Sequence, residues 1–183
     1  MTDNSALGLT KVTRQVVAKG EAATIECALT KDLASPALEA MMQLKECIWP
    51  DPDGRALPDE QQANDLAMLL ELIEDLASGE DPPAGFYNFL KDGIWELKVH
   101  GIRMTFYDTD GAGRLVTRGF ERSDRDHRLK LLPMDFGSTI RLGHTFGKPV
   151  SVRRTEPEEL KSAFQVRKED LQHDERNRKQ NGW

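Results

Sequence analysis

The sequence predicts an α+β fold in which two helices precede an antiparallel sheet and a further helix follows it. Three observations carry this prediction. Apolar residues recur at helical spacing between positions 35 and 78. From position 94 to 107 they alternate with polar residues, which is the period of a strand, and helical spacing returns over 156–168.

The N-terminal half is expected to contain one strand and two helices. Residues 1–20 are polar and lack an apolar period, so they are expected to form a flexible arm, whereas residues 22–29 are expected to form the first strand. Ser35 and Pro36 are typical of a helix N-cap and a first helical residue. A second helix is expected over 59–78. Its apolar stripe consists of Leu66, Leu69, Leu70, Ile73 and Leu76.

The segment 94–107 is expected to form a β-hairpin with a two-residue turn at His100-Gly101. This turn fixes a register in which apolar pairs share one face and polar pairs share the other. A one-residue slip would move every side chain to the opposite face, so the register is well specified. The apolar pairs are Val99 with Ile102, Leu97 with Met104, and Trp95 with Phe106, and the polar pairs are Lys98 with Arg103 and Glu96 with Thr105.

The remainder of the chain is expected to complete the sheet and to add a helix. Residues 114–122 are expected to form a third strand, and 139–152 to contain further strand segments. A helix is predicted over 156–168, because Leu160, Ala163 and Phe164 form an apolar stripe. The charged residues 169–183 are expected to form a frayed tail.

Length and composition indicate one domain, expected to span 21–168 with an insertion near 123–140. The chain has 183 residues, and no apolar run reaches the roughly 18 residues of a membrane span. The N-terminus has no apolar segment typical of a secretion signal, so a cytoplasmic location without membrane contact is expected. Cys27 and Cys47 are too few for a disulfide framework and lack metal-ligand spacing, so neither a metal nor a cofactor is expected.

Charge is divided unevenly along the chain. The net charge is −6, yet residues 91–183 carry 19 lysines and arginines against 15 aspartates and glutamates. Within this basic half the predicted register places Lys98 opposite Arg103, and like charges directly across an antiparallel pair are destabilising. Three explanations are open: Glu96 offsets the pair, the face is well solvated, or an anion such as a phosphate lies between the two cations.

The segments LLELIEDLASGEDPP and FLKDGIWELKVHGIRMTFYDTDG resemble toxins of the RelE/ParE superfamily, especially its HigB-like, phage-derived branch. The likeness extends over residues 22–122 and is sharpest over 93–107. It implies the RelE-like fold, in which a strand and two helices precede an antiparallel sheet, in agreement with the order of elements predicted above. Members of this family are ribosome-associated endoribonucleases that cut mRNA.

The family's third motif has two possible positions in this chain. Arg118 and Arg122 flank a Gly-Phe pair at natural spacing after the hairpin, which agrees with the order of strands. Alternatively, His144 and Lys148 match the motif's histidine and lysine and are followed by Arg154, but this position requires an inserted hairpin. His144 could equally be a histidine at the edge of the core, since it alternates in phase with apolar neighbours.

The resemblance implies a function for these residues. The protein would be a toxin-like endoribonuclease of a type II toxin–antitoxin system, with mRNA and the ribosome as targets and a helix-turn-helix antitoxin as partner. In such a reaction the ribose 2′-OH attacks the adjacent phosphate, cations stabilise the developing charge, and a histidine, lysine or tyrosine transfers protons. The catalytic candidates are Arg103, Lys98, Arg122, His144 and Lys148, and the RNA-binding candidates are His100, Tyr107, Arg118 and Arg154.

The alternative is a non-catalytic module of the same fold, of phage or mobile-element origin, that binds nucleic acid or a host protein. The two classes predict different responses to substitution. Catalysis should depend on Arg103 and Lys98 individually, whereas binding alone should be graded over the whole basic face and strongly salt-dependent.

Overall fold

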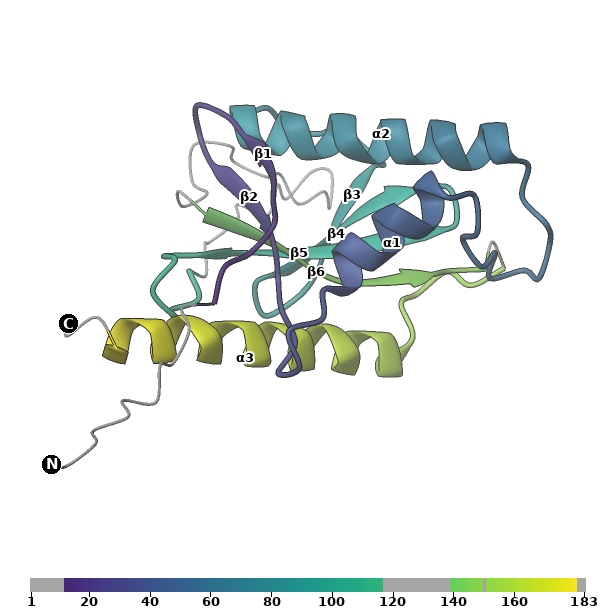
Figure 1. The fold of residues 1–183 in the computed structure, drawn as a ribbon. Coiled ribbons are helices and arrows are strands. Elements are labelled where there is room, and N and C mark those ends of the chain that lie inside the picture. Colours follow the sequence, from purple (N-terminus) through teal and green to yellow (C-terminus); the bar gives the residue numbers. More distant parts are fainter. Residues whose placement is uncertain (1–11, 117–138, 150, 181–183) are drawn as a thin grey trace, which may run out of the picture.

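A computed structural model describes residues 12–116, 139–149 and 151–180, which form three layers (Figure 1). A six-stranded sheet lies in the middle, with α1 and α2 on one face and α3 along the other. The helices are α1 (Pro36–Lys45), α2 (Asp59–Ser78) and α3 (Pro157–Gln180). The strands are β1 (Val16–Lys19), β2 (Thr24–Cys27), β3 (Tyr87–Lys91), β4 (Ile94–Val99), β5 (Ile102–Thr109) and β6 (Thr139–Gly147). The predicted α+β class is therefore confirmed.

The sheet has the order β1-β2-β6-β5-β4-β3 and is mixed, which corrects the expectation of a purely antiparallel sheet. β2 and β6 pair in parallel, from Thr24 opposite Thr139 to Cys27 opposite Leu142, and the other neighbouring strands are antiparallel. Parallel neighbours need a long connection. Here α1, α2 and the strands β3 to β5 lie between the two partners in the sequence.

Local sequence signals account for the ends of α1 and α2. The Ser35 hydroxyl accepts a hydrogen bond from the Leu38 amide at 3.3 Å, and Pro36 begins α1, as predicted. Gly79 follows α2 in the left-handed region, with a φ of 84° that glycine adopts without steric cost. Both helices turn apolar side chains, among them Leu44 and Leu69, toward the sheet.

The β4–β5 hairpin has the register predicted from the sequence. Leu97 lies opposite Met104, and Lys98 lies opposite Arg103. Leu97 and Met104 are fully buried in the main core, which the sheet shares with α1 and α2. Because side chains alternate across a strand, Lys98 and Arg103 point to the other face, which carries α3.

Both ends of the described chain differ from expectation. Residues 1–20 are expected to be a flexible arm, yet Val16–Lys19 form β1 at one edge of the sheet. The tail expected over 169–183 is helical as far as Gln180, because buried polar side chains on α3 anchor it to the sheet. None of the helices that the structure describes is long and apolar enough to cross a membrane.

The middle of the chain holds a further difference. β3 is an additional strand in a segment for which the sequence predicts no element, and it pairs with β4 at the other edge of the sheet. The third strand expected over 114–122 is described only to Val116, where Leu115 forms an isolated bridge with Thr109. Most of the insertion expected near 123–140 lies outside the described residues.

Candidate functional site

A row of side chains crosses three strands on the α3 face of the sheet. Lys98 on β4 lies opposite Arg103 on β5, and Arg103 lies opposite Phe146 on β6. Residues directly opposite in antiparallel strands have Cβ atoms about 4.5–5.5 Å apart, so the two cations are close neighbours. The structure therefore brings together the two residues that the sequence analysis places at the centre of the site.

Glu96 is the carboxylate nearest to this row in sequence, two residues before Lys98. It is only 1% exposed, and burial raises the pKa of its carboxyl above the ordinary value, although the positive charges of Arg103, Lys148 and Lys98 oppose the rise. Its Oε2 atom is buried and accepts no hydrogen bond from the described residues. One carboxylate thus faces three cations, and at most one of the three charges can be neutralised by it.

Both cations of the pair are partly desolvated. Burial lowers the pKa of Lys98; Glu96 opposes this shift, while the charges of Arg103 and Lys148 add to it. Burial likewise lowers the pKa of Arg103, and Glu96 opposes the shift. Arg103 reaches back to the hairpin turn, where Nη1 donates to the carbonyl oxygens of His100 and Ile102, at 2.7 Å each.

Lys148 is a third cation near Lys98 and Arg103, on the side toward the beginning of α3. It follows β6, is 8% exposed, and its Nζ donates to the Arg153 carbonyl oxygen at 3.1 Å. A cavity of about 270 Å³ opens beside it, with Arg153 and Arg154 on the wall and Leu160 of α3 at one side. We use the name basic cluster for Lys98, Arg103, Lys148, Arg153 and Arg154. Four of these five residues (Lys98, Arg103, Lys148 and Arg154) are sequence-based candidates.

His144 lies on the same face of the sheet and is held in place from two sides. Its Nε2 is 2.6 Å from Glu159 Oε2 in the first turn of α3, and its ring stacks on Phe146 with centroids 5.4 Å apart. Phe146 lies opposite Arg103, so the Phe146 ring lies between His144 and the pair of Lys98 and Arg103. The side chain of His144 is 19% exposed, which makes it accessible rather than a fully buried core residue.

His100 occupies the hairpin turn at the end of the same two strands. Its Nδ1 is 2.6 Å from Oδ1 of Asp65, a buried residue of α2 that the sequence analysis did not select. A signal for Asp65 exists, because it lies four residues before the buried Leu69 and therefore on the inward face of its helix.

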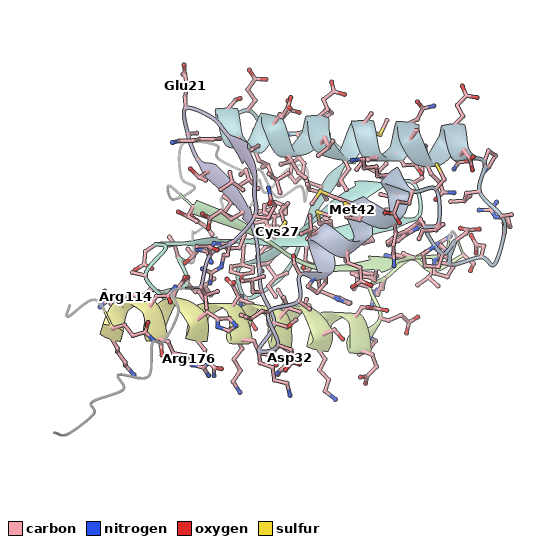
Figure 2. The ribbon with its side chains drawn as sticks, viewed as in Figure 1. Glu21, Cys27, Asp32, Met42, Arg114 and Arg176 are labelled. Atoms are coloured by element: carbon pink, nitrogen blue, oxygen red, sulfur yellow. The ribbon has the colours of Figure 1, made fainter. Side chains whose placement is uncertain are left out.

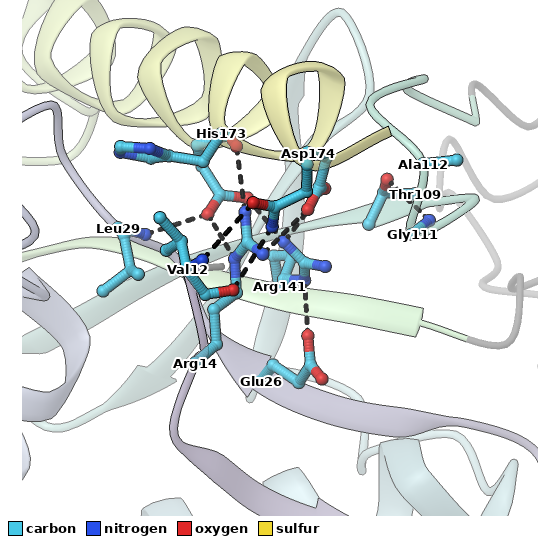
Figure 3. A network of polar contacts seen from close by, with 12 residues as sticks. Val12, Arg14, Glu26, Leu29, Thr109, Gly111, Ala112, Arg141, His173 and Asp174 are labelled. Atoms are coloured by element: carbon cyan, nitrogen blue, oxygen red, sulfur yellow. Dashed lines mark hydrogen bonds and ion pairs between the residues drawn. The ribbon is translucent and has the colours of Figure 1, made fainter. Parts of the chain in front are cut away.

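Tyr107 is not part of this surface. It is 1% exposed, and its hydroxyl donates to Asp170 Oδ2 of α3 at 2.7 Å, so it is not available to contact RNA. Arg14 and Arg141 bind the same carboxylate at 2.7 and 2.9 Å, and both also pair with Asp174 (Figure 3). We call these five residues the α3 clamp.

A cavity of about 640 Å³ lies beside the α3 clamp and away from the basic cluster. Four of its charged lining residues are already paired: Arg14 with Asp174, and Arg141 with Glu26 at 2.9 Å. A ligand there would have to compete with these ion pairs, which makes this cavity a weaker candidate site than the basic cluster.

Two candidates remain unplaced. Arg118 and Arg122 lie outside the described residues, so the first of the two possible motif positions is not described. The second position, His144 and Lys148, lies on or beside the face that carries Arg103. Within residues 12–116, 139–149 and 151–180, no group of three histidines, cysteines or carboxylates could hold a metal ion.

The arrangement can hold phosphate groups, because several cations converge beside a single buried carboxylate. It also holds a histidine and a lysine that could exchange protons. Comparison of the chain with protein-family models gives no match, and comparisons with curated proteins and with solved structures give none either. The geometry of the residues and the motifs of the sequence therefore carry the functional argument.

Proposed function

We propose that the protein is an endoribonuclease. It would hold a phosphate of the RNA on Lys98 and Arg103 and cleave the RNA strand next to that phosphate. The observation that carries this proposal is the like-charged pair on opposite strands. Such a pair weakens a sheet unless a negative charge compensates it. Glu96 is one carboxylate among three cations, so it can neutralise at most one of their charges. A phosphodiester would provide the missing negative charge.

The chemistry needs charge stabilisation and proton transfer, and the site has groups for both. Arginine and lysine side chains aimed at a phosphate stabilise the charge that develops as the 2′-oxygen attacks. Lys98, whose pKa is lowered by burial and by neighbouring cations, can carry a proton away more readily than an exposed lysine. The imidazole of His144, oriented by Glu159, is a second group for proton transfer.

The nature of the substrate is proposed from the sequence. The resemblance of residues 93–107 to RelE/ParE toxins supports mRNA as the substrate, the ribosome as the place of cleavage and a helix-turn-helix antitoxin as the partner. The observed order of elements, with β2, α1 and α2 before the sheet strands β3 to β6, is compatible with the RelE-like fold.

Growth and transcript mapping in a bacterial host test the proposal. We expect the wild-type chain to arrest growth and to create new 5′ ends in ribosome-bound mRNA. Arg103→Ala should lower the cleavage rate by about 10²–10³, the usual loss for one donor to a transition state. Arg176→Ala is the matched control, because Arg176 lies on the outer side of α3, away from the sheet (Figure 2). It removes one positive charge and should leave cleavage unchanged.

The same experiment separates the enzyme from the binding module. A wild-type chain that binds RNA but neither slows growth nor cuts mRNA would contradict the nuclease. Binding that weakens gradually as cations of the basic cluster are removed, and that falls steeply with salt, would then support the non-catalytic module.

A further inference from the structure

Lys98 has a side chain that is neither buried nor paired. It is the only residue of β4 that is not buried. Among the residues that the structure describes, none accepts a hydrogen bond from its ammonium group or forms an ion pair with it. Lys148, the neighbouring lysine of the basic cluster, differs in both respects, since it is 8% exposed and its Nζ donates to the Arg153 carbonyl oxygen. Lys98 is therefore an accessible amine without a fixed partner.

The surroundings of Lys98 favour its neutral form. Arg103 lies directly opposite on β5, and like charges so placed repel each other. Partial burial lowers the pKa of the Lys98 amine; the charge of Glu96 opposes this shift, and the charges of Arg103 and Lys148 add to it. The neutral amine is the nucleophilic form of lysine. Lysines that are desolvated or lie beside another cation are the ones that form imines with carbonyl compounds in enzymes.

The cation opposite Lys98 has donors to spare for an anion. Nη1 of Arg103 donates to two carbonyl oxygens of the hairpin turn, whereas its buried Nε donates to none of the described residues. A buried donor without an acceptor is costly, and a phosphate oxygen is a strong acceptor for a guanidinium group. Side chains directly opposite in antiparallel strands have Cβ atoms about 4.5–5.5 Å apart. A phosphate bound to Arg103 would therefore lie close to the amine of Lys98.

We propose that Lys98 is a nucleophilic amine that forms an imine with aldehydes that carry a phosphate group. Arg103 holds the phosphate, and Lys148 adds positive charge beside it. The neutral amine attacks the carbonyl carbon, the carbonyl oxygen leaves as water with the two protons of the amine, and a double bond joins that carbon to Nζ. This activity does not depend on the proposed ribonuclease function, because no RNA strand is cut in it.

Trapping with borohydride tests this proposal on the full chain. The protein is incubated at neutral pH with glyceraldehyde 3-phosphate and sodium cyanoborohydride, which donates a hydride to the imine and leaves a secondary amine that peptide mass spectrometry can locate. We expect Lys98 to be labelled at least about tenfold faster than the exposed Lys161 of α3, because a bound aldehyde reacts within its complex. Lys148, which is nearly buried, should be labelled slowly.

Three controls separate the bound phosphate from general reactivity. Glyceraldehyde without a phosphate should lose most of the preference for Lys98, and inorganic phosphate should slow the labelling of Lys98 but not that of Lys161. Lys98→Arg keeps the positive charge and should carry no adduct at this position. Arg103→Ala should reduce the advantage of the phosphorylated aldehyde. Circular dichroism of both variants shows whether a loss of labelling comes from unfolding, and the competition with inorganic phosphate needs no variant.

The aldehyde can come from a small sugar phosphate or from an abasic residue of a nucleic acid, where it lies near two phosphates. A single-stranded oligonucleotide with one abasic residue is therefore the second probe, and the faster of the two reactions identifies the source. The proposal is wrong if Lys98 and Lys161 are labelled at equal rates with both probes, or if the preference for Lys98 persists without a phosphate. If Lys98 is trapped but the protein cuts no RNA, only the proposed ribonuclease function fails.

Discussion

The Tyr107 hydroxyl donates a 2.7 Å hydrogen bond to Asp170, joining the middle of β5 to the middle of α3. Asp170 also accepts a hydrogen bond from the backbone amide of Leu29 at 2.9 Å. One fully buried carboxylate therefore connects α3 both to β5 and to the segment that follows β2. Arg14 and Arg141 supply its positive partners. The α3 clamp explains why a helix rich in charged residues stays docked.

Removing Asp170 should destabilise the fold strongly. Asp170→Ala leaves Arg14 and Arg141 buried without their main partner, and breaking a buried ion pair in this way costs about 3–5 kcal/mol. Urea unfolding followed by circular dichroism measures the loss. Lys161→Ala is the control, because its pair with Glu158 is exposed on both sides, and it should have little effect. Equal losses in the two variants would show that the clamp is not a main anchor.

Glu96→Gln should strengthen the binding of RNA. The substitution removes the one carboxylate that acts on the basic cluster and keeps nearly the same shape. We expect affinity for a non-cleavable oligonucleotide to rise by about three- to tenfold, equivalent to roughly 0.7–1.4 kcal/mol. The gain should grow with pH, because wild-type Glu96 acquires its charge only above its raised pKa. Fluorescence anisotropy at several pH values measures it, and a gain that shrinks with rising pH would contradict this role.

The same carboxyl should give stability a specific pH dependence. Because burial raises the pKa of Glu96 in the folded state, the folded chain binds more protons than the unfolded chain between the two pKa values. Its contribution to the free energy of unfolding is therefore complete below the ordinary pKa of a glutamate and is lost as the pH rises through the raised value. Relative to Glu96→Gln, the wild type should lose stability as the pH rises through this window. Denaturant unfolding of both proteins at matched pH values measures this difference. If the free energy of unfolding changes with pH in the same way in both proteins, the Glu96 carboxyl is not desolvated and the prediction is wrong.

Arg153 and Arg154 should contribute through charge rather than through chemistry. Both side chains are exposed at the cavity before α3. Each phosphate bound on a single strand contributes about −0.7 to the slope of log affinity against log salt. Replacing both arginines by alanine should make the slope of log affinity against log salt less negative, by about 0.7 for each phosphate that the variant no longer binds. The same variant should keep the kcat of the wild type. A slope identical to that of Arg176→Ala would show that bound RNA does not contact these two arginines.

The two cysteines should differ in reactivity. Burial raises the pKa of the Cys27 thiol to about 11, and this residue is fully enclosed beneath α1, near the centre of the molecule in Figure 2. The thiolate is the reactive form, so Cys27 should resist iodoacetamide at neutral pH, whereas the half-buried Cys47 should react. Mass spectrometry should find one label on the native chain and two after unfolding. Rapid labelling of Cys27 would show that the core opens readily.

Local patterns in the sequence were sufficient for the parts of the fold that depend on neighbours in the chain. The β4–β5 register follows from alternation and a two-residue turn, and the start of α1 follows from Ser35 and Pro36. β1 was not predictable, because four residues at the edge of a sheet carry little pattern of their own. The parallel pairing of β2 with β6 was equally hidden, since nothing local specifies a partner so distant in the chain.

In the candidate site, too, residues placed by local sequence patterns could be predicted, whereas contacts between distant residues could not. Lys98 and Arg103 could be found because a hairpin register places them opposite each other. The α3 clamp could not, because Arg14 and Asp170 are 156 positions apart. One signal was nevertheless present: Asp170 and Asp174 continue the helical spacing of Ala163 and Val166, so the polar residues occupy the inward face of α3. A buried position held by a charged residue indicates an ion pair, although not which partner forms it.

Among the strands that the structure describes, β6 is the last to be synthesised, yet it lies between β2 and β5 in the middle of the sheet. The β4–β5 hairpin can close within about 1–10 μs of appearing, whereas the sheet stays open along two edges until the residues from Thr139 onward are available. An unfinished chain would expose those edges to other chains. Because Phe146 and Lys148 arrive with this strand, a nascent chain carries the arginine of the hairpin but not its complete surroundings. Translation itself would therefore delay the proposed activity until β6 and the residues that follow it have been made.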